Sequence, residues 1–384
     1  MNTMRHAIAT LACVLGCAAA HAETVLPRSD AEVIETLPAA VGGRAEERRL
    51  RRDWAANPRD AAKAVALARH HLDQARSQGD PRHAGQALAV LQAWPDPAQA
   101  SDDVLLLLAT IEQYLHEFDA SAAHLERLVN RRPQHAQAWL TLATVRRVQG
   151  RYADSDRACA ALAATGAALY AQACQAENDG LRGDVDAARD RLRRLVAAPR
   201  LPSDSRNWLL TTLAELEARA GRPAEAEAAY RMAWAALPDA YTAMSFADFL
   251  MQQGRHADAL IQLKGQPPTD AVLLRRAIAG TQAQSPDAPR DVREVRERMA
   301  LANLRPDART THAREQAMFA LWVDGAAQRA MQLARANVRM QREPLDLLLL
   351  AQAARATGDS AALREADAIR KEMGLHDQRL DALL

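Results

Sequence analysis

The sequence predicts an all-α protein built as a solenoid of antiparallel helix hairpins. Alanine and leucine dominate the 384 residues, aromatic residues make up only 4%, and runs of β-branched residues are scarce, which favours helix almost throughout. A pattern of small residues around a glycine recurs at intervals of 33 to 38 residues. Leucines such as Leu142, Leu162 and Leu192 supply apolar faces at helical spacing.

The clearest copy of this pattern lies within WLTLATVRRVQGRYADSDRACAAL, residues 139–162. Ala143 is followed by Gly150, then by Tyr152 and Ser155, so the two small residues stand twelve apart. From Ala109 to Ala247 the first alanines of successive copies are 34, 33, 38 and 33 residues apart. The other copies are Ala109, Phe118, Ser121; Ala176, Gly183, Val185, Ala188; Ala214, Gly221, Pro223, Ala226; Ala247, Gly254, Ala257, Ala259; and, more loosely, Ala351, Gly358, Ser360, Leu363.

Each member of the pattern has a physical reason. Small side chains at Ala143 and Ser155 let two antiparallel helices approach closely where they cross. Gly150 ends the first helix, because glycine takes a positive φ at low cost, and Tyr152 opens the second. One hairpin cannot bury its apolar faces alone, so the hairpins are expected to stack.

These residues resemble the tetratricopeptide repeat (TPR) family. The order of Trp139, Leu142, Ala143, Gly150, Tyr152 and Ser155 is similar to the family pattern, and a second unit matches it more fully. The resemblance covers roughly residues 60–265 well and 311–374 more loosely. It implies a right-handed superhelical solenoid of the exported bacterial type, with the first helix of each hairpin lining a concave face. The second unit consists of Leu210, Leu213, Ala214, Gly221, Ala226, Tyr230, Ala233 and Pro238.

Two regions depart from the pattern. His116 stands where the turn glycine is expected, so a tighter or helical turn is expected there. Residues 264–310 lose the period, and KGQPPTD and TQAQSPDAPRD look like breaks around a short helix. The expected organisation is a signal peptide (1–22), a leader and first helix (23–57), a repeat array (58–265), an irregular helical joint (266–310) and C-terminal repeat-like helices (311–384).

The first 22 residues indicate export. Arg5 precedes an apolar stretch that ends in Ala20-His21-Ala22, a small-x-small cleavage pattern. We therefore expect a periplasmic protein that begins at Glu23. The alternative is lipid anchoring in the envelope at Cys17, because VLGC loosely resembles a lipoprotein signal. No later stretch is long and apolar enough to span a bilayer.

The charge balance bears on the classes of partner that the protein can bind, and the cysteine content bears on whether it holds a disulfide. Cleavage removes Arg5 and no acidic residue, leaving 48 basic and 48 acidic residues, which gives no electrostatic case for binding nucleic acid. Of the four cysteines, Cys159 and Cys174 remain. An oxidising compartment favours a disulfide between them, and the alternative is two buried thiols.

No catalytic, metal or cofactor site is predicted. The histidines are scattered without the spacing of a metal-binding helix, and no Gly-x-Ser-x-Gly or phosphate-binding loop is present. Acidic pairs such as Asp102-Asp103 are explained by a helix N-terminus. The protein is therefore expected not to be an enzyme.

The TPR resemblance instead implies a binding groove. In the register above, the last three of the five regular repeats present an aromatic row, Tyr170-Trp208-Tyr241, beside an acidic row, Glu177-Glu215-Asp248. Such rows are typical of a peptide groove, and the acidic row favours a basic partner segment. The alternative is that the aromatic residues pack between hairpins and the acidic residues are ordinary surface. The candidate groove residues are Thr110, Gln137, Thr144, Arg147, Tyr170, Glu177, Trp208, Glu215, Tyr241 and Asp248.

The predicted function is a non-enzymatic scaffold for protein–protein contacts, an adaptor or assembly factor that binds a peptide or helix of another protein. One alternative is a structural subunit of an envelope complex, anchored at Cys17. Another is a substrate-delivery part of an enzyme complex, which the small non-repeat segments disfavour.

Overall fold

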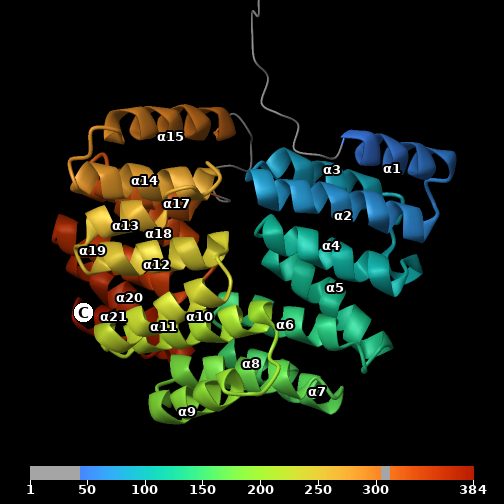
Figure 1. Ribbon diagram of the computed structural model, residues 1–384, viewed down its shortest axis with the longest axis horizontal. Helices are drawn as coiled ribbons and strands as arrows, with labels where there is room; N and C mark the ends of the chain where they lie inside the picture. Colours follow the sequence, from blue (N-terminus) through green and yellow to red (C-terminus); the bar gives the residue numbers. More distant parts are fainter. Residues whose placement is uncertain (1–43, 304–311) are drawn as a thin grey trace, which may run out of the picture. The chain divides into compact units, whose positions relative to one another are not determined.

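The computed structural model describes residues 44–303 and 312–384 (Figure 1). The predicted signal peptide (1–22), most of the predicted leader and Cys17 lie outside the described residues. Residues 47–384 form one packed unit, to which the following description applies. Within the described residues every regular element is a helix, which confirms the predicted all-α class.

The predicted array of hairpins is present. Successive helices pair into antiparallel hairpins, and each hairpin packs on the next along the chain (Figure 1). A first helix, α1 (Arg44–Ala56), and a 3₁₀ turn, Pro97–Gln99, flank the first pair. The pairs are α2 (Ala61–Gln78) with α3 (Pro81–Leu91), α4 (Asp102–Tyr114) with α5 (Phe118–Arg131), α6 (Ala136–Val148) with α7 (Tyr152–Ala164), α8 (Ala168–Leu181) with α9 (Val185–Val196), α10 (Ser203–Arg219) with α11 (Pro223–Ala236), and α12 (Ala240–Gln252) with α13 (His256–Gln262).

The recurring residues take the places that the sequence predicts for them. Ala143 and Ser155 are fully buried where α6 crosses α7, and Ser121 donates a hydrogen bond of 2.8 Å to the carbonyl oxygen of Ala109 at the preceding crossing. Gly150 has a φ of 74°, and the turn is closed by a 2.8 Å bond from the Arg151 amide to the Arg146 carbonyl. Bonds of this kind satisfy the last carbonyls of a helix. The predicted crossing and turn roles are confirmed.

The expectation for the turn at His116 is wrong. His116 itself adopts the left-handed conformation, with a φ of 64°, and the Glu117 amide bonds the Glu112 carbonyl at 2.8 Å as in the glycine turns. The side chain is held in place, because its Nδ1 lies 2.9 Å from the Gln341 amide group. Gln341, far away in the sequence, thus contacts a histidine whose left-handed backbone conformation is energetically unfavourable.

The segment that was expected to be an irregular joint is more regular than the sequence indicates. Helices α14 (Asp270–Gln282) and α15 (Ala288–Ala302) pack together as a further pair, and α14 also packs on α12 and α13. The turn between α14 and α15 lacks a glycine: Gln284 takes the left-handed conformation, with a φ of 55°, and the Ser285 amide bonds the Gly280 carbonyl at 2.8 Å. A Cβ atom on Gly280 would lie 3.1 Å from that of Ala288.

The C-terminal helices return to the middle of the array, which the sequence does not reveal. These are α17 (Ala313–Trp322), α18 (Ala327–Asn337), α19 (Pro344–Thr357), α20 (Ser360–Met373) and α21 (Gln378–Asp381). The Arg342 amide donates to the Val148 carbonyl at 2.7 Å, and the His376 amide donates to the Leu181 carbonyl at 2.8 Å. A Cβ atom on Gly150 would lie 3.0 Å from Met373 Cγ, so this segment packs directly on the turn.

A buried ion-pair network joins three of these C-terminal helices. Asp346, in the first turn of α19, is fully buried and accepts bonds from Arg314 Nε at 2.6 Å and Nη2 at 2.7 Å. Asn337 Nδ2 donates to the same carboxylate at 2.6 Å, and the Glu343 amide donates at 2.8 Å. Arg314 also pairs with the Glu343 carboxylate. Every lone pair of Asp346 thus faces a donor, as a buried carboxylate requires.

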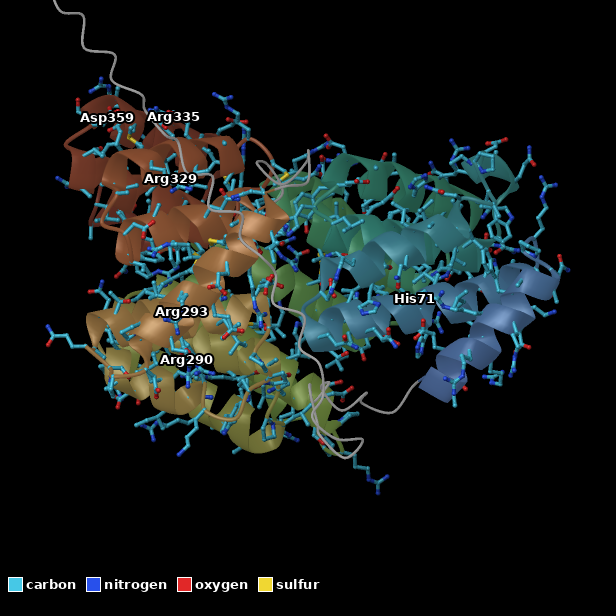
Figure 2. The ribbon with its side chains drawn as sticks, turned by 90° about the horizontal axis from the view of Figure 1, so that it is seen from above. His71, Arg290, Arg293, Arg329, Arg335 and Asp359 are labelled. Atoms are coloured by element: carbon cyan, nitrogen blue, oxygen red, sulfur yellow. A yellow bond between two sulfur atoms is a disulfide. The ribbon has the colours of Figure 1, made fainter. Side chains whose placement is uncertain are left out.

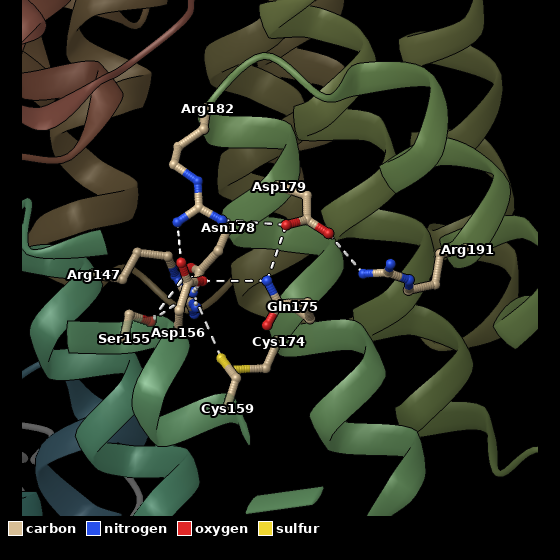
Figure 3. A network of polar contacts seen from close by, with 10 residues as sticks. All are labelled: Arg147, Ser155, Asp156, Cys159, Cys174, Gln175, Asn178, Asp179, Arg182 and Arg191. Carbon is tan, nitrogen blue, oxygen red and sulfur yellow. Dashed lines mark hydrogen bonds and ion pairs between the residues drawn. A yellow bond between two sulfur atoms is a disulfide. The ribbon is translucent and has the colours of Figure 1, made fainter. Parts of the chain in front are cut away.

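Cys159 and Cys174 form a disulfide between α7 and α8, with Cα atoms 5.8 Å apart (Figure 3). Of the two alternatives from the sequence, the bonded pair is the one in the structure. Asn178 is fully buried beside it and donates to Ser155 at 2.9 Å and to Asp156 at 2.8 Å. The disulfide and this polar network together fix one hairpin to the next.

His71 on α2 is a buried titratable group (Figure 2). Only 2% of it is exposed, and its Nδ1 has no hydrogen-bond partner within the described residues. Burial lowers the pKa of His71 from 6.5 to about 4, and the nearby charge of Arg51 acts in the same direction. The imidazole is therefore neutral in the folded protein at pH 7.

Acidification is expected to destabilise the fold through His71. In the unfolded chain His71 takes up a proton near pH 6.5, whereas in the folded chain it does so only near pH 4. The free energy of unfolding is therefore largest above pH 6.5 and decreases as the pH falls from 6.5 to 4. The loss amounts to at most about 3 kcal/mol. Urea unfolding at several pH values should show this slope in the wild type and a shallower one in His71→Leu. An unchanged slope in the variant would assign the acid sensitivity to other groups.

Candidate functional site

The inner face of the array encloses two adjoining cavities, of 410 Å³ and 230 Å³. The larger cavity is lined mainly by the first helices of successive hairpins, α6, α8, α10 and α12. Glu343 and Pro344, at the start of α19, line both cavities, so the chain's own C-terminal segment closes part of the inner face. The cavities also share Glu215, Arg219 and Tyr241.

Most of the predicted groove residues meet at these cavities. Asp248 lines the smaller one together with Glu215 and Tyr241. Thr110 and Gln137 lie apart, in a pocket of 220 Å³ further toward the N-terminus. The larger cavity is lined by Thr144, Arg147, Glu177, Trp208, Glu215 and Tyr241.

The predicted aromatic row is partly exposed, and two of its three rings lie close together. The Tyr170 and Trp208 rings lie 5.8 Å apart between centroids, with their planes tilted by 31°. Tyr170 is 39% exposed and Tyr241 60% exposed, and Trp208 is half-buried. The alternative from the sequence, packing between hairpins, applies in part to Trp208, which also packs against a buried hydrophobic cluster. Large exposed aromatic side chains on one face mark a candidate binding surface.

The acidic row is compensated within the protein. Glu177 pairs with Arg147 at 2.9 Å, and Asp248 pairs with Arg275 through two bonds of 2.7 and 2.8 Å. Glu215 Oε1 accepts bonds from the Tyr241 hydroxyl at 2.9 Å and the Ser245 hydroxyl at 2.8 Å. Burial raises the pKa of Glu215, although these hydroxyl bonds and the charge of Arg219 oppose the shift. The expectation that this row attracts a basic partner is therefore corrected, because two of its three charges already face arginine.

Sequence reasoning missed two residues of the site. Arg219, the last residue of α10, is 8% exposed, and within the described residues it has no hydrogen-bond or ion-pair partner for its guanidinium group. Tyr152 is 3% exposed, and its hydroxyl likewise lacks a partner there. Both line the larger cavity. In the sequence Arg219 reads as an ordinary charge at a helix end, and Tyr152 reads as a turn residue, so no signal marks them.

The described residues contain no cluster of three or more histidine, cysteine or acidic side chains that could hold a metal ion. Among the helices in the described ranges, none has the length and apolar character needed to cross a bilayer. The inner face thus combines partly exposed aromatic side chains, cavities that are open to solvent and, within the described residues, unpaired polar groups.

The stacked hairpins, the left-handed turn residues and the buried small residues at the crossings make the fold all-α and TPR-like. Such a fold indicates a scaffold for protein or other ligands. No family model matches the sequence, and no curated protein matches it. Among solved structures, a tetratricopeptide repeat protein from Parabacteroides merdae is 18% identical over 57% of this chain and 83% of its own, with a TM-score of 0.46. Human IFIT1, in a dimer with PPP-AAAA, is 13% identical over 81% of this chain and 72% of its own, also with a TM-score of 0.46.

Proposed function

We propose that this protein is a non-enzymatic scaffold that binds a peptide or helix of another protein along the inner face of its hairpin array. The observation that carries the proposal is the aromatic row, in which Tyr170 and Tyr241 are exposed and Trp208 is half-buried against Tyr170. Tyrosine and tryptophan dominate the binding energy of protein interfaces, because they bury a large area with few rotatable bonds. The two rings of Tyr170 and Trp208 lie against each other, so the surface is already arranged for an apolar side chain.

We propose that the partner's contact is apolar rather than ionic. Glu177 and Asp248 are already paired with Arg147 and Arg275, so a basic partner would have to displace those arginines. An apolar side chain that packs on the Tyr170–Trp208 pair needs no such exchange. Binding should accordingly depend only weakly on salt concentration.

We further propose that the scaffold acts in the periplasm. Residues 1–22 have the features of a cleaved signal, and the disulfide between Cys159 and Cys174 is of the kind that persists in oxidising compartments. The alternative, a structural subunit anchored in the envelope through Cys17, rests on the VLGC sequence alone. The intact mass of the protein from an exported fraction decides between a chain that begins at Glu23 and one that is lipidated at Cys17.

Crosslinking in that fraction, with the bound chain identified by mass spectrometry, tests the partner proposal. Trp208→Ala should lower partner recovery by roughly 30-fold, which corresponds to the loss of about 2 kcal/mol at a central aromatic anchor. Met232→Ala is the matched control, because Met232 is 55% exposed on α11 outside the aromatic row. Circular dichroism must show both variants folded. Equal recovery by wild type, Trp208→Ala and Tyr170→Ala would refute binding at the aromatic row.

A further inference from the structure

The larger cavity contains an arginine that no carboxylate of the described residues pairs with directly, although its charge acts on nearby Glu215. Arg219 is more than nine-tenths buried, and its guanidinium group meets no acceptor among the described residues. A buried cation without a partner is strongly unfavourable, so such groups are rare in proteins unless they serve a ligand. The nearest candidate on its own helix is Glu215, one turn earlier.

Glu215 does not pair with Arg219 because other groups hold its carboxylate. The hydroxyls of Tyr241 and Ser245 both donate to Oε1, at 2.9 and 2.8 Å. Oε2 has no hydrogen-bond partner within the described ranges, and the residue lines both cavities. The cavity therefore presents a free guanidinium group and a free carboxylate oxygen from one helix.

The remaining lining restricts what can enter. A volume of 410 Å³ falls within the range of small-molecule sites. The Tyr152 hydroxyl is a second polar group of the cavity without a hydrogen-bond partner among the described residues. Burial raises the pKa of Tyr152, and the positive charge of Arg219 opposes this shift. Glu177 and Glu343 also line the cavity, and each is already paired with an arginine, Arg147 and Arg314 respectively. Trp208 offers an apolar wall.

We propose that this cavity binds a small zwitterion of the α-amino acid class. Its carboxylate pairs with Arg219 and accepts the Tyr152 hydroxyl, its ammonium group donates to Glu215, and its side chain packs on Trp208. Bidentate pairing with carboxylate is the geometry that a guanidinium group favours. This inference goes beyond the partner scaffold proposed above, and its test needs no partner protein.

Thermal unfolding of the purified protein with each of the common L-amino acids at about 10 mM tests the proposal, since a ligand of the folded state raises the melting temperature. At least one should raise it by roughly 2 °C or more. For that amino acid, the matched carboxylic acid without the amine and the matched amine without the carboxylate should each give a clearly smaller shift. Titration calorimetry then gives the dissociation constant.

Three variants make the result specific. Arg219→Met should abolish the shift, and Tyr152→Phe should weaken binding roughly 10-fold, the loss of one hydrogen bond to a charged group. Arg231→Met is the control, because Arg231 is an exposed arginine paired with Glu227, and it should keep the shift. Without ligand, Arg219→Met should melt no lower than the wild type, because it removes an unpaired buried charge.

The proposal is overturned if no amino acid raises the melting temperature, if Arg219→Met retains the shift, or if the carboxylic acid without the amine is as effective as the amino acid. If Arg219→Met does not fold, Arg219→Gln and Tyr152→Phe give the test instead, since Arg219→Gln removes the charge and Tyr152→Phe removes the hydroxyl while both keep most of the side-chain volume. Tyr170→Ala separates the two proposals, because Tyr170 belongs to the aromatic row but is not among the residues that line the larger cavity: it should weaken partner binding and keep the amino-acid response.

Discussion

Replacing Arg314 by methionine is expected to destabilise the fold by about 3–5 kcal/mol, the usual result of removing one partner from a buried ion pair. Asp346 is fully buried and receives two of its hydrogen bonds from Arg314. Burial raises the pKa of Asp346, while the charge and hydrogen bonds of Arg314 act in the opposite direction. Without Arg314 this carboxylate must either stay charged and uncompensated or take up a proton.

Urea unfolding followed by circular dichroism measures this loss. Arg231→Met is the matched control, because Arg231 is 67% exposed in its ion pair with Glu227, and it should change stability by less than about 0.5 kcal/mol. Adding Asp346→Asn to Arg314→Met should recover part of the loss, because the amide carries no charge. If Arg314→Met unfolds at the same urea concentration as the control, the network does not stabilise the C-terminal helices.

Removing the disulfide is expected to cost about 3 kcal/mol. The bond between Cys159 and Cys174 closes a loop across a sequence separation of 15 residues, and a loop of that size restricts the unfolded chain by about this amount. The bond also fixes α7 to α8, and Cys174 lines the larger cavity. Without the disulfide we therefore expect both a lower free energy of unfolding and a less ordered cavity lining.

The Cys159→Ala/Cys174→Ala variant and the wild type should be compared by thermal unfolding, each with and without a reductant. The wild type with reductant should approach the variant, and the variant should not respond. Both cysteines are 1% exposed, so reduction must be carried out long enough for the fold to open. A variant that melts with the wild type would mean that the helix packing alone holds α7 and α8 together.

Local features of the fold follow from the sequence because they depend on one residue and its near neighbours. Gly150 marks a left-handed turn, and the spacing of Ala143 and Ser155 marks a helix crossing, wherever the rest of the chain lies. The same register placed Trp208 and Glu215 on the inner face. Both residues line the larger cavity in the structure, whereas the ion pairs of Glu177 and Asp248 with arginine have no counterpart in the sequence pattern.

The remaining features depend on contacts between segments far apart in the chain. His116 keeps a glycine-like conformation beside Gln341, 225 positions away, and no local pattern indicates this. Arg314 and Arg219 look alike in the sequence, yet one has buried acidic partners and the other has none. Arg314 differs because it bonds Asp346 in the first turn of α19, a contact between helices that periodicity cannot predict.

The return of the C-terminal helices to the middle of the array has a consequence for how the protein reaches its final state. Repeats that touch only their neighbours can fold one after another as the chain is made. Here Arg379 bonds Gln252 across 127 positions, and the His376 amide bonds the Leu181 carbonyl. The segments that complete the middle hairpins thus lie far downstream of them in the chain. The middle hairpins reach their final packing only when these segments have docked, and until then the cavity beside Trp208 and Arg219 lacks the wall that Glu343 and Pro344 provide.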